Sequence, residues 1–329
     1  MSSSFTYKFL RSQKFVTLPY PERKFTGQTI IVTGSNVGMG LEAARHLVRL
    51  DAEKVILAVR SLPKGEAAKK SIEGSEKRPG VVEVWGLDLA SYASVKAFAA
   101  RAETLPRLDV VIENAGIYVF DFETAEEDEA TITVNVVSTF LLGLLLLPKL
   151  RRTAVTFGTV PVLSFVGSFV HNLTTFPERK ADNVFVELSD EKKAGMADRY
   201  NVSKMLDLLC LRGLAKDLDT SPKEGRVIAS LINPGFVDTA IMRNATGVYK
   251  YFALFMKKLI TRTTEEGGRT LVAAAYGGPE THGAYLDDCK PGTVSAFVSS
   301  DDGAATQKKV WDELKEKLEK IQPGILQNI

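Results

Sequence analysis

Several features that would narrow the class of this 329-residue chain at once are scarce in it. Its two cysteines, Cys210 and Cys289, are too few for a disulfide framework and fit a reducing compartment. We expect two free thiols, with a disulfide between them as the alternative. The net charge is only +2 and no basic stripe occurs, so we expect no nucleic-acid partner.

Long apolar runs are missing too. The longest, from Phe140 to Leu147, is too short to span a bilayer and indicates a buried helix. The first residues hold no continuous apolar segment of the secretory type. We therefore expect a cytoplasmic protein without a transmembrane segment. We expect no metal site, and the absence of repeats and low-complexity linkers makes one domain the simplest account.

Short apolar runs alternate with amphipathic helical patterns along most of the chain. The predicted strands are 29–32, 54–60, 81–85, 108–112, 160–166, 227–232 and 282–286. The predicted helices are one directly after residue 40, then 64–73, 93–105, 127–150, 200–218, 263–275 and 305–321. The acidic segment 121–129 is predicted to be a solvated helix start. Because strands and helices alternate, the fold class should be α/β, a single-domain Rossmann-like, doubly wound parallel sheet with helices on both faces.

A glycine-rich turn joins the first predicted strand to the first predicted helix. It reads Thr33-Gly34-Ser35-Asn36-Val37-Gly38-Met39-Gly40. Glycines let the backbone turn tightly and approach a pyrophosphate, and the following helix N-terminus offers unpaired N–H groups. This is the context that a dinucleotide fingerprint requires, and a turn without any ligand is the alternative.

The end of the second predicted strand bears on the choice of dinucleotide. An acid there would bind the ribose 2′-hydroxyl of NAD, but the chain has Val59 followed by Arg60. A guanidinium pairs well with a 2′-phosphate, so Arg60 favours NADP(H). A plain surface arginine is the alternative.

Tyr200 and Lys204 stand four residues apart in a predicted helix and so share one face of it. A lysine ammonium near a phenol favours the phenolate and lowers the pKa of the tyrosine. Such a tyrosine can give a proton to a carbonyl oxygen as hydride arrives at the carbon. The pair alone carries little weight, because this spacing is frequent on helix surfaces.

Taken together, these motifs resemble the short-chain dehydrogenase/reductase family over about residues 29 to 286. Further matches occur in the family's order: Asp88-Leu89, Asn114-Ala115-Gly116, Asn135, Ser168 and Pro234-Gly235. Three segments resemble filamentous-fungal members of its retinol-dehydrogenase-like branch. They are residues 9–13 (FLRSQ), 41–50 (LEAARHLVRL) and 54–61 (KVILAVRS). Many of those fungal members belong to secondary metabolism.

The resemblance implies a role for each matched residue. The implied catalytic set is Asn135, Ser168, Tyr200 and Lys204, with Tyr200 as acid or base, Lys204 lowering its pKa and holding the nicotinamide ribose, Ser168 bonding the substrate oxygen, and Asn135 holding a relay water. The implied cofactor set is Gly34, Ser35, Asn36, Val37, Gly38 and Gly40 at the pyrophosphate, Arg60, Asp88, Leu89 and Asn114 on the adenosine side, and Tyr200, Lys204, Pro234, Val237 and Thr239 at the nicotinamide.

Plainer interpretations stand beside three of these. Asn135 could satisfy a backbone carbonyl inside its helix, Asp88 could cap the following helix, and Ser168 could be a strand-end cap, with Ser164 as a rival. The chain also departs from the family in two places. The 32-residue separation of Ser168 from Tyr200 is longer than usual, as in the retinol-dehydrogenase-like branch, and Gly167 replaces the usual serine.

We therefore predict NADPH-dependent reduction of a hydrophobic ketone or aldehyde, or the reverse alcohol oxidation, by a monomer or homodimer. A non-redox catalyst of the same fold (epimerase, dehydratase or cyclase) and a nucleotide-binding regulator are the alternatives. The expected layout is an N-terminal extension that packs partly on the body, then an NADP(H)-binding catalytic domain. The expected ranges are 1–26 for the extension, 27–329 for the domain, 169–199 for a polar, irregular insertion and 239–262 for a substrate lid rich in Met, Phe and Tyr.

Overall fold

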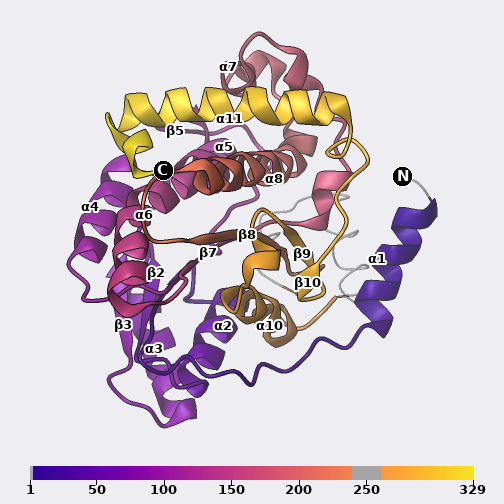
Figure 1. The fold of residues 1–329 in the computed structure, drawn as a ribbon. Helices are drawn as coiled ribbons and strands as arrows, with labels where there is room; N and C mark the ends of the chain where they lie inside the picture. Colours follow the sequence, from indigo (N-terminus) through magenta and orange to yellow (C-terminus); the bar gives the residue numbers. More distant parts are fainter. Residues whose placement is uncertain (1–2, 239–260) are drawn as a thin grey trace.

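A central sheet organises the chain in the computed structural model, which describes residues 3–238 and 261–329 (Figure 1). Within these residues the eight strands lie in the order β10 (Lys290–Pro291), β9 (Tyr285–Asp287), β8 (Ile228–Asn233), β7 (Val162–Val166), β4 (Val110–Glu113), β1 (Thr29–Thr33), β2 (Lys54–Val59) and β3 (Val82–Gly86). All neighbours pair in parallel except β10, which is antiparallel to β9. The predicted Rossmann-like α/β fold is confirmed, and its strand order reverses beside β1, where such sheets bind ligands.

Helices cover both faces of this sheet, so its strands are apolar on both sides. The first face carries α2 (Gly38–Arg49), α3 (Leu62–Glu76) and α10 (Thr264–Ala275), and the second α4 (Tyr92–Glu103), α6 (Ser138–Phe157) and α8 (Met196–Thr220). In β1, Ile30 and Val32 pack toward the first face and Ile31 toward the second. The last long helix, α11 (Asp301–Ile321), lies along the outside of α8 (Figure 1).

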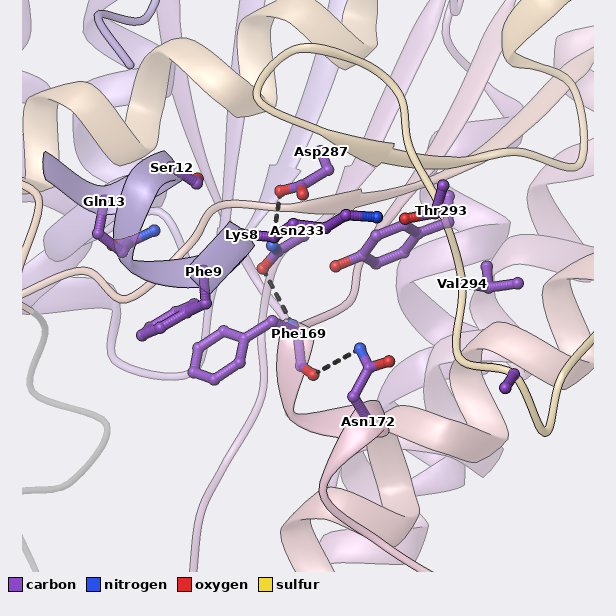
Figure 2. A pocket seen from close by; sticks show the side chains of 12 residues that line it. Lys8, Phe9, Ser12, Gln13, Phe169, Asn172, Asn233, Asp287, Thr293 and Val294 are labelled. Carbon is purple, nitrogen blue, oxygen red and sulfur yellow. Dashed lines mark hydrogen bonds between the residues drawn. The ribbon is translucent and has the colours of Figure 1, made fainter. Parts of the chain in front are cut away.

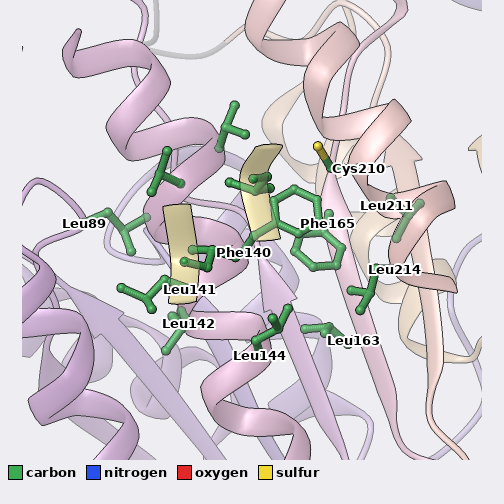
Figure 3. Close-up of a cluster of buried hydrophobic side chains, with 14 of the residues drawn as sticks. Leu89, Phe140, Leu141, Leu142, Leu144, Leu163, Phe165, Cys210, Leu211 and Leu214 are labelled. Atoms are coloured by element: carbon green, nitrogen blue, oxygen red, sulfur yellow. The ribbon is translucent and has the colours of Figure 1, made fainter. Parts of the chain in front are cut away.

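The predicted buried helix is α6, and it lies at the centre of the hydrophobic core on the second face of the sheet, here called the second-face core. A short α5 (Ala130–Ile132) and a π-helical turn η1 (Thr133–Val137) lead into α6. The stretch Ala130–Phe157 is long and apolar enough to cross a membrane, but 94% of its most apolar window is buried inside the protein. Phe140 stacks on Phe165 of β7 with ring centroids 4.8 Å apart, among the leucines of Figure 3. These contacts identify it as a core helix.

The prediction of a solvated acidic helix start over 121–129 is wrong. The segment contains a small hairpin, β5 (Thr124–Ala125) and β6 (Asp128–Glu129), and both acids of β6 are buried. Asp128 Oδ2 lies 2.9 Å from Lys317 Nζ of α11, and Glu129 Oε2 lies 3.5 Å from Arg199 Nε. These partners are distant in the sequence, and they offset the cost of burying the two carboxylates.

The insertion after β7 is more ordered than predicted. It holds the short helices η2 (Phe169–Asn172), η3 (Pro177–Lys180), α7 (Val184–Leu188) and η4 (Glu191–Lys193), and α8 begins at Met196, before Tyr200. Phe176, Phe185 and Leu188 are buried in the main core. Apolar anchors thus fix a segment whose overall composition is polar.

The N-terminal segment packs on the body through a helix, α1 (Ser3–Phe15). Phe9 contacts Phe169 with ring centroids 4.3 Å apart, whereas Leu10 and Phe15 are exposed. The remaining short elements are η6 (Pro279–Thr281) and η7 (Ile325–Asn328). Cys210 and Cys289 are free thiols, as expected.

Candidate active site

The glycine-rich turn leaves β1 and enters α2. Gly34 has φ +63°, and a Cβ there would lie 2.9 Å from Ala115 Cα; a Cβ on Gly40 would lie 2.5 Å from Asn114 Nδ2. The cap position of α2 is Val37, whose side chain is exposed and bonds none of the first helical N–H groups. A turn with no room for a Cβ at Gly34 and Gly40, directly before a helix N-terminus without a side-chain cap, fits a pyrophosphate.

The end of β4 is tied to this turn. Thr33 Oγ1 accepts the backbone N–H groups of Asn114 and Ala115, both at 2.9 Å, and Asn114 Nδ2 donates to Thr33 O at 2.8 Å. The buried Ser35 Oγ donates to Val32 O at 2.7 Å. The predicted residues on β1 and β4 therefore meet at one edge of the sheet.

The predicted adenosine-side residues follow the next two strands. Arg60 comes directly after β2 and is exposed. Asp88 Oδ1 accepts the Ala90 N–H at 3.0 Å, while Ser91 is the side-chain cap of α4, so Asp88 is not that cap. Leu89 is 4% exposed and packs in the second-face core.

Asn135 lies in the π-helical turn and bonds outside its own helix. Its Oδ1 accepts the Ile117 N–H at 2.8 Å, and its Nδ2 donates to Ile117 O at 3.0 Å and to Ser203 Oγ at 3.2 Å. It therefore links the segment after Gly116 to α8, the helix of Tyr200. Such π-turns are frequent at functional sites.

Ser168 caps η2, which packs against α8. Its Oγ accepts the Val170 N–H at 3.3 Å, which leaves the hydroxyl proton available for another acceptor. The rival Ser164 is fully buried inside the sheet, where its Oγ meets Ser230 Oγ at 3.5 Å. A Cβ on Gly167 would overlap the Leu231 side chain, which explains the glycine in place of the family's serine.

Lys204 forms a buried ion pair beside Tyr200. Its Nζ donates to Asp207 Oδ2 and to Val166 O, both at 2.9 Å, and lies 5.8 Å from the Tyr200 ring centroid. An ammonium has three N–H groups, so one remains for a ligand. Val166 precedes Ser168 by two residues, and Lys204 therefore joins the tyrosine's helix to the end of β7.

These charges act on one another. Burial raises the pKa of Tyr200, Lys204 lowers it and Asp207 raises it, with a net shift upward. Burial raises the pKa of Asp207 to about 6, against the lowering effect of Lys204. Burial acts to lower the pKa of Lys204, but Asp207 and Tyr200 raise it above its ordinary value. The expected effect of Lys204 on Tyr200 is present but is outweighed, and the phenol stays protonated at neutral pH.

The loop after β8 completes the nicotinamide side of the predicted set. Arg262 is 3% exposed and donates through Nη1 to Pro234 O at 3.1 Å. The backbones of Val237 and Arg262 form a single β-bridge outside the strands. Thr239 and nearly all of the predicted lid 239–262 lie outside the described residues. The roles of the individual site residues stay predictions.

The chain is similar to known proteins over almost its whole length. A family profile described as short chain dehydrogenase matches residues 28–169. The short chain dehydrogenase/reductase dmxR8 of Cryptosporiopsis sp. (strain 8999) is 47% identical over 97% of this chain and 99% of its own length. The chain belongs to the short-chain dehydrogenase/reductase family. This family assignment makes the protein an oxidoreductase by kinship, and the resemblance inferred from the motifs is confirmed.

One more relative and one solved structure extend the comparison. The short-chain dehydrogenase anuD of Penicillium roqueforti (strain FM164) is 45% identical over 96% of this chain and 84% of its own. The structure of an NADPH-bound carbonyl reductase from chicken fatty liver superposes with a TM-score of 0.59 over 83% of this chain and all of the other, at 22% identity. The first supports a fungal kinship and the second the fold.

Sequence reasoning missed three features of this short-chain dehydrogenase/reductase site. Asp207 was overlooked although it stands three residues after Lys204, a spacing that brings side chains together on a helix. Tyr118 stacks on Tyr200 at 4.5 Å and on Phe120 at 4.6 Å, and the aromatic residues after the Asn-Ala-Gly turn could have suggested this. Glu113, an acid at the end of a buried strand, was also not predicted as a site residue.

Glu113 ends β4 directly before Asn114 and is 2% exposed. Its Oε2 accepts a long bond of 3.4 Å from Thr33 Oγ1. Burial raises the pKa of Glu113 to about 8. A mostly neutral carboxylic acid therefore lies beneath the predicted dinucleotide site at neutral pH.

Replacing Glu113 by glutamine should change how the free energy of unfolding depends on pH. Because the native pKa of Glu113, about 8, is above its ordinary 4.5, the wild type loses stability as pH rises through that window, by up to ~1.4 kcal/mol per pH unit. Glutamine does not ionise, so toward alkaline pH the variant should have a larger free energy of unfolding than the wild type. Near pH 4.5 the two free energies of unfolding should be equal. Urea unfolding across the window measures this; parallel curves for the two proteins would contradict it.

Proposed function

We propose that the protein reduces a ketone or aldehyde with NADPH and that Tyr200 is the proton donor. The observation that carries the proposal is the packing of η2, capped by Ser168, against α8, which carries Tyr200 and Lys204. Lys204 Nζ donates to Val166 O, two residues before Ser168, and the pKa of Tyr200 lies above its ordinary value. The glycine-rich turn, which has no room for a Cβ at Gly34 or Gly40, supports dinucleotide binding.

Each residue has a definite task in this proposal. A reduced nicotinamide, when bound, would supply hydride to the carbonyl carbon. Tyr200 then donates its phenolic proton to the carbonyl oxygen, and Ser168 Oγ donates a hydrogen bond to the same oxygen. Lys204 uses its remaining N–H for the nicotinamide ribose. Reduction needs the protonated phenol, and Tyr200 is protonated at neutral pH because its pKa lies above its ordinary value.

The decisive experiment is an NADPH-oxidation screen with the purified protein against aryl and alkyl ketones and aldehydes. We expect turnover of at least one class, with the alcohol identified as the product. Tight NADPH binding without oxidation across the panel would contradict the proposal and favour a non-redox catalyst or a regulator. The domain limits, the cytoplasmic location and the monomeric or dimeric state stay predictions.

The preference for NADPH should depend on Arg60. Arg60→Ala should weaken NADPH binding about tenfold or more and leave NADH binding unchanged, because only NADPH presents a 2′-phosphate to the guanidinium. Val59 is 1% exposed, so an acid that favours NADH belongs at position 60 and not at 59. Cofactor titration by fluorescence measures both constants, with Lys70→Ala on α3 as a control; equal affinities of the wild type for NADH and NADPH would show this role of Arg60 to be wrong.

Asp207 should set the pH range of the reaction. In Asp207→Asn the carboxylate that raises the pKa of Tyr200 is gone, so that pKa should fall and reduction should decline at lower pH than in the wild type. The pH profile of kcat for reduction measures the shift. The same change at Asp217, on α8 but bonded to Trp311 Nε1, is the control; identical profiles for the wild type and Asp207→Asn would refute it.

A further inference from the structure

The N-terminal helix closes one side of a cavity beside the candidate active site (Figure 2). The cavity has a volume of about 200 Å³ and lies between α1, η2, the ends of β8 and β9, and residues 293–296. Phe169 lines it and directly follows Ser168, while Asn233 lines it and directly precedes Pro234. The cavity therefore adjoins both loops that carry predicted substrate and nicotinamide contacts.

Helix α1 is fixed in place by polar bonds as well as by Phe9. Gln13 Oε1 accepts the Phe236 N–H at 3.0 Å, and Ser12 Oγ donates to Asp288 Oδ1 at 2.8 Å. Arg262 Nη2 donates to Ser12 O at 3.1 Å. The wall that α1 supplies is thus bound to the loop after β8 and to the turn after β9.

The cavity combines ring surfaces with hydrogen-bonding groups. Its apolar walls are Phe9, Phe169 and Val294, together with the ring of Tyr285. Its polar groups include Lys8, Asn172, Asn233, Asp287 and Thr293. Asn233 is already engaged, since its Oδ1 accepts the Phe169 N–H and its Nδ2 donates to Asp287 Oδ1 at 2.9 Å.

Two of the polar groups keep capacity for a ligand. Figure 2 shows the Lys8 side chain reaching from α1 into the cavity, and among the described residues Lys8 makes no ion pair. Thr293, from the segment after β10, presents a hydroxyl for which no bond to the described residues is found. A ligand group that accepts hydrogen bonds could engage both.

We propose that this cavity binds a hydroxylated aromatic ring at the end of the substrate remote from the carbonyl group. The size fits, because a cavity of about 150 Å³ already holds benzene, and the extra volume leaves room for one or two small polar substituents. Aromatic walls accept the ring face, while Lys8 and Thr293 donate to its hydroxyl oxygen. This inference rests on the proposed carbonyl reduction and names its substrate class, which is more polar than the hydrophobic carbonyls expected from the sequence.

Two probe ketones that differ by one hydroxyl test the inference: benzylacetone and its para-hydroxyphenyl counterpart. Isothermal titration calorimetry in the presence of NADP⁺ measures binding, and NADPH oxidation measures KM and kcat. The hydroxylated ketone should bind about tenfold more tightly or better, since it alone carries a ring oxygen that can accept a hydrogen bond from the Lys8 ammonium. Equal affinities of the two ketones for the wild type would overturn the inference.

Variants then locate the effect. Lys8→Met keeps the stem and removes the charge, and Thr293→Val removes only the hydroxyl. Each should reduce the advantage of the hydroxylated ketone severalfold through its KM, with kcat, benzylacetone kinetics and NADPH affinity unchanged. Lys14→Met, on the same helix but outside the cavity lining, should behave as the wild type.

The outcomes separate the two proposals. If NADPH is oxidised with both ketones and no variant alters their ratio, the cavity does not hold the ring and the proposed function survives. If neither ketone nor any carbonyl compound of the screening panel is reduced, yet the hydroxylated ketone binds more tightly in a Lys8-dependent manner, the cavity is a ligand site and the carbonyl reductase proposal fails.

Discussion

Replacing Tyr200 by phenylalanine should lower kcat for carbonyl reduction by roughly two orders of magnitude or more. Only the hydroxyl is removed, while the ring that stacks on Tyr118 at 4.5 Å is kept. NADPH should therefore bind with nearly unchanged affinity, because Lys204 retains its bonds to Asp207 and Val166. Single-turnover kinetics combined with cofactor titration separates the two effects.

Tyr276→Phe is the matched control for that experiment. Tyr276 stacks on Phe25 at 4.9 Å and donates its hydroxyl proton to Arg23 O, away from α8. Removal of the Tyr276 hydroxyl should leave kcat unchanged. Turnover retained in Tyr200→Phe would mean that another acid protonates the substrate.

The second large effect is expected from Gly34→Ala, which should reduce NADPH affinity at least tenfold. The residue has φ +63°, which costs an L-residue roughly 1–2 kcal/mol, and the added methyl would approach Ala115 Cα to 2.9 Å. Either β1 or the end of β4 must then move, and the turn loses its shape. Equilibrium binding of NADPH measures the loss, with circular dichroism to confirm that the sheet is intact.

Gly74→Ala supplies the control, since a Cβ there meets no atom within 4 Å on the exposed side of α3. Alanine in a helix is preferred over glycine by roughly 0.5–1 kcal/mol, so this variant should be slightly stabilised and bind NADPH normally. If Gly34→Ala binds NADPH as tightly as Gly74→Ala does, the dinucleotide does not use this turn.

Local patterns in the sequence predicted the sheet and the placement of most site residues. The spacing of Tyr200 and Lys204, the glycine turn, and the capping box of Thr263 and Glu266 each depend on a few consecutive residues, so the sequence displays them directly. The alternation of strands and helices then requires a parallel sheet with the site at the carboxyl ends of its strands.

Partners from distant segments were not predictable in this way. Asp128 is satisfied by Lys317, 189 residues later, and nothing near Asp128 in the sequence announces that partner. An acidic run with no visible partners suggests a solvated surface, and that prediction was wrong. The cavity at Lys8 was not predicted for the same reason, because its other walls come from residues 169–172, 233 and 285–296.

The bond between Ser12 and Asp288 joins positions 276 residues apart, and this separation governs the order in which the molecule can assemble. During synthesis α1 emerges before the sheet, but its binding surface is complete only after β9 and the turn beyond it have been made. The parallel sheet can form around β1 without α1, so the cavity that α1 lines should close in the last step of folding. By the same reasoning α1 should detach first under mild denaturant, and its amide hydrogens should exchange with solvent before those of the sheet.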